Sequence, residues 1–87
     1  MKLEIVTPEK MVFSKNIGMA ILPGAEGDFG VLDNHSPVIS ELREGEVAVF
    51  ANATDSVANE KFAIKGGIAQ VTATTCTILA TAIQQAA

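Results

Sequence analysis

Hydrophobic and polar residues alternate along most of this chain with a period of two. In residues 2–7, apolar Leu3 and Ile5 alternate with charged Lys2 and Glu4. This period is typical of a strand with one buried face. No segment shows the 3.6-residue period of an amphipathic helix, so the pattern predicts an all-β chain.

The same pattern predicts further short strands, separated by turns rich in Gly, Pro, Asn and Asp. They are expected near residues 11–13, 17–21, 29–32, 38–42, 47–49, 62–64, 68–72 and 76–83. Met11 and Phe13 are expected to share one face, as are Ile17, Met19 and Ile21, and residues 84–87 are expected to form a tail. A count of roughly eight to ten short strands indicates a small antiparallel β-sandwich or flattened barrel.

The composition narrows the class of protein. At 87 residues the chain is expected to form one domain, residues 1–87. The net charge of −4, with six scattered basic residues, argues against a nucleic-acid partner. No apolar run approaches the roughly 18 residues of a membrane span, and the start does not resemble a signal peptide. A single cysteine, Cys76, fits a reducing compartment, so we expect a small soluble domain without membrane insertion.

One stretch, residues 21–37, carries most of the informative residues: I-L-P-G-A-E-G-D-F-G-V-L-D-N-H-S-P. Three glycines recur at every third residue, which lets the backbone make tight turns or adopt positive φ. Glu26 and Asp28 lie between them, and the only histidine, His35, follows. The stretch predicts a glycine-rich loop that projects two carboxylates from a β scaffold, followed by a second corner.

None of these residues forms a convincing catalytic, cofactor or metal site. Glu26 and Asp28 would need a cleft that separates their pKa values to act as an acid/base pair, and exposed loop carboxylates are usually only solvated. His35 has no second histidine or cysteine at ligand spacing. The glycine run matches no nucleotide-binding motif. Cys76 has no basic neighbour in the sequence and is expected to be a small buried side chain.

The loop resembles the signature of the ε subunit of F-type ATP synthases, which is called δ in mitochondria. Further matches are Leu-Glu-Ile-Val-Thr-Pro at the front, and Gly-Gly-Ile-Ala-Gln-Val and Thr-Ile-Leu-Ala at the back. Ordered matches in three separated places are more specific than any one of them. The family has an N-terminal β-sandwich and a C-terminal helical hairpin; the resemblance covers the sandwich only, and the helical domain is expected to be absent. Asp33 stands where many relatives have proline, so a slightly looser corner is expected.

The resemblance implies a non-catalytic central-stalk (rotor) subunit of a proton-translocating ATP synthase, which helps to couple proton flow to ATP synthesis. Its partners would be the γ subunit, the polar loops of the c-ring and, indirectly, the α and β catalytic subunits. It would lie peripherally on the cytoplasmic face of the bacterial inner membrane. Contacts to the c-ring are expected from Glu26, Gly27, Asp28, Phe29 and Gly30. Contacts to γ are expected from His35, Ser36, Pro37, Val38, Ile39 and Leu42. Little inhibition of ATP hydrolysis is expected, because the family restrains it chiefly through the helical hairpin.

The alternative is a free-standing β-sandwich that binds a small ligand or carbohydrate, or a minor enzyme that uses Glu26, Asp28 and His35. This alternative predicts a concave polar pocket around those side chains. The subunit interpretation instead predicts an exposed apolar stripe outside any pocket.

Overall fold

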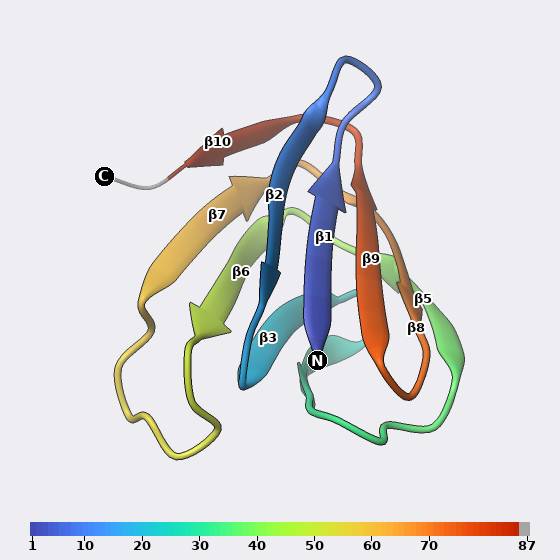
Figure 1. Cartoon of the computed structure of the whole chain (residues 1–87). Coiled ribbons are helices and arrows are strands. Elements are labelled where there is room, and N and C mark those ends of the chain that lie inside the picture. Colours follow the sequence, from blue (N-terminus) through green and yellow to red (C-terminus); the bar gives the residue numbers. More distant parts are fainter. Residues whose placement is uncertain (86–87) are drawn as a thin grey trace.

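A computed structural model describes residues 1–85, which form ten β-strands (Figure 1). They are β1 (Lys2–Val6), β2 (Met11–Asn16), β3 (Met19–Gly24), β4 (Gly27–Val31), β5 (Val38–Leu42), β6 (Gly45–Phe50), β7 (Glu60–Ile64), β8 (Gly67–Val71), β9 (Thr75–Ala80) and β10 (Ile83–Gln85). The predicted all-β class and strand number are confirmed. Within these 85 residues, no helix is long and apolar enough to cross a membrane.

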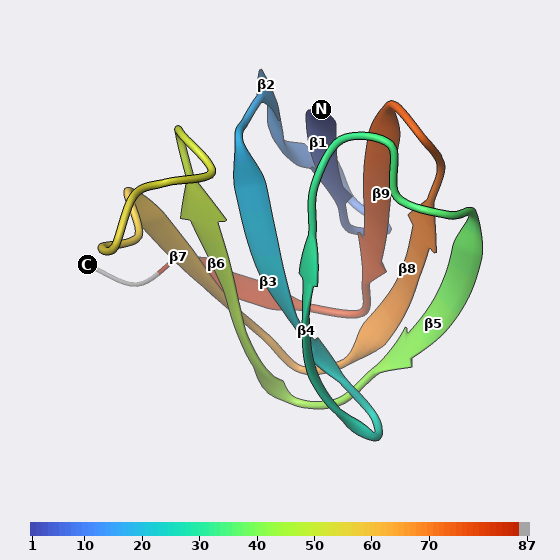
Figure 2. The same cartoon turned by 90° about the horizontal axis from the view of Figure 1, so that it is seen from below.

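The strands form one curled sheet in the order β10-β7-β6-β3-β5-β8-β9-β1-β2, and β4 pairs with β3 alone outside this path. All pairs are antiparallel except β1 with β9, which run parallel. The sheet curls so that its two ends face each other like a half-barrel (Figures 1 and 2). Phe13 of β2 meets Phe62 of β7 edge to face, with ring centroids 5.2 Å apart, and so joins the two ends across the core.

The concave side of the sheet holds the hydrophobic core. In β1, Leu3 and Ile5 are fully buried while Lys2 is exposed, as the alternation predicts. Val47 of β6 and Ile64 of β7 are likewise buried in the core. Burial of each such side chain contributes about 1.5–3 kcal/mol, and no polar or charged side chain of the described residues is buried among them. An apolar interior of this kind supports shape and carries no chemistry of its own.

The prediction that Met11 and Phe13 share a face is wrong. Ile5 pairs with Phe13 and Val6 pairs with Met11, so the register shifts by one residue at Val12. Such a bulge reverses the facing of every side chain beyond it. Phe13 therefore enters the core, whereas Met11 is 53% exposed on the outer face.

Two boundaries near the C-terminal end also differ from the predictions. The single strand expected at residues 76–83 is two strands, because β9 ends at Ala80 and the chain turns at residues 81–82. The Thr81 amide at this turn donates to the Gly66 carbonyl at 3.1 Å, which ties the turn to the connection between β7 and β8. The tail expected at residues 84–87 is wrong for its first half, since β10 pairs with β7; residues 86–87 lie outside the described part. A periodic pattern cannot show that a strand changes its partner.

Candidate interaction surfaces

The β3–β4 hairpin projects beyond the rest of the sheet at one end of the molecule (Figure 2). Gly24 pairs with Gly27, and Ala25 and Glu26 form the turn between them. A Cβ on Gly24 would lie 2.6 Å from the Gly27 carbonyl oxygen and 2.9 Å from the Phe29 ring, so only glycine allows the two strands this approach. Gly27 has φ 137°, a conformation that L side chains rarely adopt. We call residues 24–28 the tip.

The residues predicted to contact a c-ring all lie in this hairpin. Glu26, Gly27, Asp28 and Gly30 are exposed, whereas Phe29 is half-buried and packs against the core. The tip and the neighbouring edge of β5 enclose a shallow polar groove of about 440 Å³. The hairpin therefore presents backbone and two carboxylates to the outside, on an aromatic anchor.

The sequence analysis missed Arg43, which lies between β5 and β6 and reaches the tip. Its Nη1 donates to the Gly24 carbonyl at 2.6 Å, and its Nη2 donates to Asp28 Oδ1 at 2.6 Å. Its backbone amide donates to the Pro23 carbonyl at 2.9 Å. The only sequence signal was that Arg43 is the chain's sole arginine and follows β5 directly. Its partners lie 15 and 19 residues away, beyond the reach of a local pattern.

The corner at residues 32–37 is held on both sides. Asp33 Oδ1 lies 2.6 Å from the N-terminal amino group, and the Asn34 amide donates to the Ala73 carbonyl at 2.8 Å. Asn34 has φ 64°, a conformation that asparagine tolerates well. His35 places Nδ1 2.7 Å from the Ser36 carbonyl, an acceptor for an Nδ1–H tautomer. These contacts tie the corner to the N-terminal amino group and to the connection between β8 and β9.

The residues predicted to contact γ separate into surface and core. Ser36 and Pro37 are exposed and His35 is half-buried. In β5, Val38 is 39% and Ile39 is 72% exposed. Leu42 is only 4% exposed and lies in the hydrophobic core, because it alternates to the inner face of β5. The prediction that Leu42 contacts a partner is therefore wrong for this fold, because its side chain is not at the surface.

An apolar stripe crosses the convex face of the sheet, and two open hollows lie along it, one lined by Val6 and Leu79 and the other by Ile39. Ile68 of β8 pairs with Leu79 of β9, Leu79 with Val6 of β1, and Val6 with Met11 of β2. Ile39 of β5 lies diagonally beside Ile68 on the same face. Ile68, Leu79 and Met11 are each about half exposed and Val6 is partly buried. We call Ile39, Ile68, Leu79, Val6 and Met11 the outer stripe.

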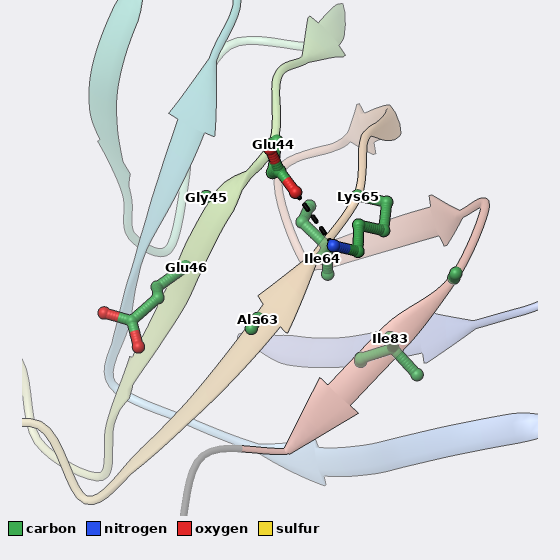
Figure 3. A pocket seen from close by; sticks show the side chains of 8 residues that line it. Glu44, Gly45, Glu46, Ala63, Ile64, Lys65 and Ile83 are labelled. Carbon is green, nitrogen blue, oxygen red and sulfur yellow. Dashed lines mark hydrogen bonds and ion pairs between the residues drawn. The ribbon is translucent and has the colours of Figure 1, made fainter.

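Among the four main hollows lined by residues 1–85, none brings together Glu26, Asp28 and His35, the side chains that the small-ligand alternative requires. The groove beside the tip includes Glu26 and Asp28, but His35 does not line it. A second hollow of about 350 Å³ lies between β6, β7 and β10 (Figure 3). Its ion pair, Lys65 Nζ to Glu44 at 3.0 Å, is about 70% exposed on both sides. The described polar groups of this hollow therefore do not converge on a buried point.

Cys76 lies in β9 with its side chain in the core and no solvent exposure. Burial raises the pKa of its thiol from 9.0 to about 11, because desolvation disfavours the thiolate. The thiol is therefore protonated at neutral pH and is a poor nucleophile. Among residues 1–85, no cluster of three or more His, Cys, Asp or Glu side chains has the arrangement to hold a metal ion.

Comparisons with known proteins identify relatives across nearly the whole chain. The family model of the ATP synthase delta/epsilon chain β-sandwich domain matches residues 1–86. The ATP synthase epsilon chain of Caulobacter vibrioides is 50% identical over 76 residues, which cover 87% of this chain and 84% of the relative. That of Gluconacetobacter diazotrophicus is 43% identical over 79 residues, which cover 91% of this chain and 54% of the relative. The chain thus spans about half the length of several curated relatives that it matches.

Two solved assemblies contain chains of the same fold. One is the Euglena gracilis mitochondrial ATP synthase, OSCP/F1/c-ring, with a TM-score of 0.83 and 19% identity over 95% of this chain and 51% of the other. The other is the central stalk/c-ring of the Tetrahymena thermophila mitochondrial ATP synthase, with a TM-score of 0.78 and 14% identity over 95% and 64%. At such identities the likeness establishes the fold alone. The family model, which matches all but one residue, decides membership: this chain belongs to the β-sandwich domain family of ATP synthase delta/epsilon chains.

Proposed function

We propose that this chain is a non-catalytic central-stalk subunit of a proton-translocating F-type ATP synthase, with residues 1–87 acting as one domain. It joins the γ subunit to the c-ring and supports the coupling of proton flow to ATP synthesis. The observation that carries this proposal is the match of the family model over residues 1–86. In a bacterial cell its place would be peripheral, at the cytoplasmic face of the inner membrane.

The outer stripe and the end of β5 next to it supply the surface for γ. Ile39 is the most exposed large apolar side chain in any described strand. It continues into Ile68 and Leu79, so an apolar partner could cover all three at once. His35 to Val38 extend this surface toward the corner. Desolvated apolar side chains at the centre of an interface carry most of its binding free energy.

The tip supplies the surface for the c-ring. It is exposed, polar and acidic at Glu26 and Asp28, and it projects from the sheet where a flat partner surface could reach it (Figure 2). Polar contacts of this kind set orientation and specificity more than affinity. The polar loops of a membrane ring match this chemistry better than an apolar surface does.

A non-catalytic role agrees with the chemistry of the described residues. The only thiol is buried and protonated, and the only imidazole donates to a carbonyl of the neighbouring residue. Glu26 and Asp28 are both exposed at the tip, and Asp28 is already engaged by Arg43. What the chain offers is a rigid shape with two different surfaces.

The test is direct binding to the cognate γ subunit, measured by calorimetry. We expect one-to-one binding by the wild-type chain and a loss of at least tenfold in affinity for Ile39→Asp, because a buried unpaired carboxylate is costly. The matched control is Val57→Asp: Val57 is also β-branched and 76% exposed, but it lies in the loop between β6 and β7.

Equal weakening by both variants would mean that the loss is not specific to the stripe. Absence of binding by the wild-type chain, to γ and to F1 depleted of this subunit, would overturn the proposed function. In that case ligand binding by the β-sandwich would become the leading hypothesis.

A further inference from the structure

Arg43 contacts both strands of the hairpin from the loop between β5 and β6. The guanidinium donates to the Gly24 carbonyl at the end of β3 and to the Asp28 carboxylate near the start of β4. The two acceptors flank the turn, so one planar group spans the base of the tip. Both distances are 2.6 Å, short enough for charge-assisted hydrogen bonds. The fork of arginine fits two acceptors at once, which an ammonium group does not.

The tip has few other supports. β4 pairs only with β3, and a two-stranded ribbon is marginally stable alone. The link from β3 to β5 is a single register pair, Gly24 with Leu42, plus the Ala25 amide donating to the Glu41 carbonyl at 2.9 Å. Loss of the guanidinium would therefore leave the tip held by these backbone bonds and by the Phe29 ring beside Gly24.

The two carboxylates of the tip are not equivalent. Asp28 is paired with Arg43, and so its charge is partly neutralised within the chain. Glu26, at the turn itself, is exposed and forms no ion pair with any of residues 1–85. A cationic or polar group on a partner would meet Glu26 as a full charge.

We propose that Arg43 is the positioning residue of the tip, which commits Asp28 to holding the hairpin and leaves Glu26 as the carboxylate that meets the partner. The part that concerns the partner rests on the proposed function; the positioning part concerns the free chain. Arg43 would act through the hairpin and not by touching the partner.

The first experiment measures hydrogen exchange of the Ala25 amide in the free full-length chain by NMR. We expect about fivefold faster exchange in Arg43→Gln, because the hairpin opens more often without its side-chain brace. Arg43→Lys keeps the charge but reaches one acceptor, so it should give an intermediate rate. The Asn34 amide serves as the internal reference, and Lys65→Gln, which removes another exposed ion pair, is the matched control.

A double-mutant cycle tests the named partner. Asp28→Asn should speed the exchange of Ala25 in the wild-type background and add little in Arg43→Gln, because the pair acts as one unit. Additive effects of the two substitutions, or an unchanged Ala25 rate in Arg43→Gln, would overturn the positioning role. Since Arg43 is 46% exposed, the variant should still fold, and a thermal melt checks this.

The second experiment measures binding to a rotor complex of γ and c-ring from which this chain has been removed. Glu26→Gln should weaken binding about fivefold without changing the exchange of the Ala25 amide in the free chain. Asp28→Asn should instead speed the exchange of the Ala25 amide and weaken binding less than Glu26→Gln does. Stronger loss for Asp28→Asn than for Glu26→Gln would overturn the division between the carboxylates. Failure of the wild-type chain to bind, with faster exchange in Arg43→Gln, would overturn the proposed function and leave the positioning role supported.

Discussion

The tip and the outer stripe adjoin at β5, yet different kinds of contact hold them in place. The stripe lies on five hydrogen-bonded strands, β5, β8, β9, β1 and β2, and these strands also carry core residues such as Ile5, Val71 and Ile78. The tip is a two-stranded ribbon that depends on glycine geometry and on Arg43. The chain thus offers one apolar surface held by a continuous set of paired strands and one polar surface held by turn geometry and a single arginine.

Two glycines with similar φ give the strongest contrast. Gly67, at the start of β8 beneath the stripe, has φ 152°, and a Cβ there would overlap the Leu79 carbonyl oxygen. Gly67→Ala should therefore lower the free energy of unfolding by about 4 kcal/mol or more, as strain adds to overlap. Gly27→Ala, where φ is 137° but the space is open, should cost about 1–2 kcal/mol. Urea unfolding measures both, and equal losses would contradict the contrast.

Alkaline pH should weaken the sheet beneath the stripe. The thiol of Cys76 has its pKa raised from 9.0 to about 11, so the unfolded chain loses this proton at lower pH than the folded chain does. The contribution of this thiol to the free energy of unfolding is constant below pH 9. It is lost between pH 9 and 11, by about 1.4 kcal/mol per pH unit and roughly 2–3 kcal/mol in total. Cys76→Ala should remove this slope in urea unfolding across that range. A slope that survives the substitution would assign it to other groups.

Leu79→Ser should separate binding from stability at the stripe. Leu79 is 51% exposed on the convex face, so its truncation should change the free energy of unfolding by less than about 0.5 kcal/mol. Affinity for γ should fall about tenfold, since the side chain would be desolvated in the interface. Calorimetry at low and high salt should give the same loss. A loss that disappears at high salt would indicate an electrostatic contact instead.

The smallest effect should come from Glu26→Gln. An exposed carboxylate without an ion pair inside the described chain should contribute almost nothing to folding, within about 0.5 kcal/mol. Its contact with the rotor should weaken as salt screens it, with a Debye length of about 10 Å at 0.1 M. Glu9→Gln, in the exposed turn at residues 7–10, is the control. Salt-independent binding by the wild-type tip would contradict a charged contact there.

The sequence predicted the strand class and many of the strands because alternation is a local property. Residues 38–42 match β5 at both ends. The facing of Met11 was wrong because a bulge at Val12 depends on pairing with β1, which no local pattern records. The strand expected at 76–83 failed for a related reason, since β10 leaves β9 to pair with β7.

The contact residues were predicted from the family resemblance, and the structure shows which of them are exposed and which are buried. Leu42 has the same apolar character as Ile39, and only its side of β5 decides that it enters the core. Arg43 escaped notice because its partners are a backbone carbonyl and a carboxylate brought near by the hairpin. Which face a residue takes, and which distant group it meets, are set by tertiary pairing.

The parallel pairing of β1 with β9 has a consequence for synthesis on the ribosome. Leu3 pairs with Cys76, so β1 meets this neighbour only after residue 76 has emerged. At roughly 5–20 residues per second, this leaves β1 without its central partner for about 4–15 s. During that time Leu3 and Ile5 have only the β2 hairpin to cover them, and an unpaired apolar strand invites wrong contacts. Pairing with β9 thus ends the period in which β1 is open to aggregation.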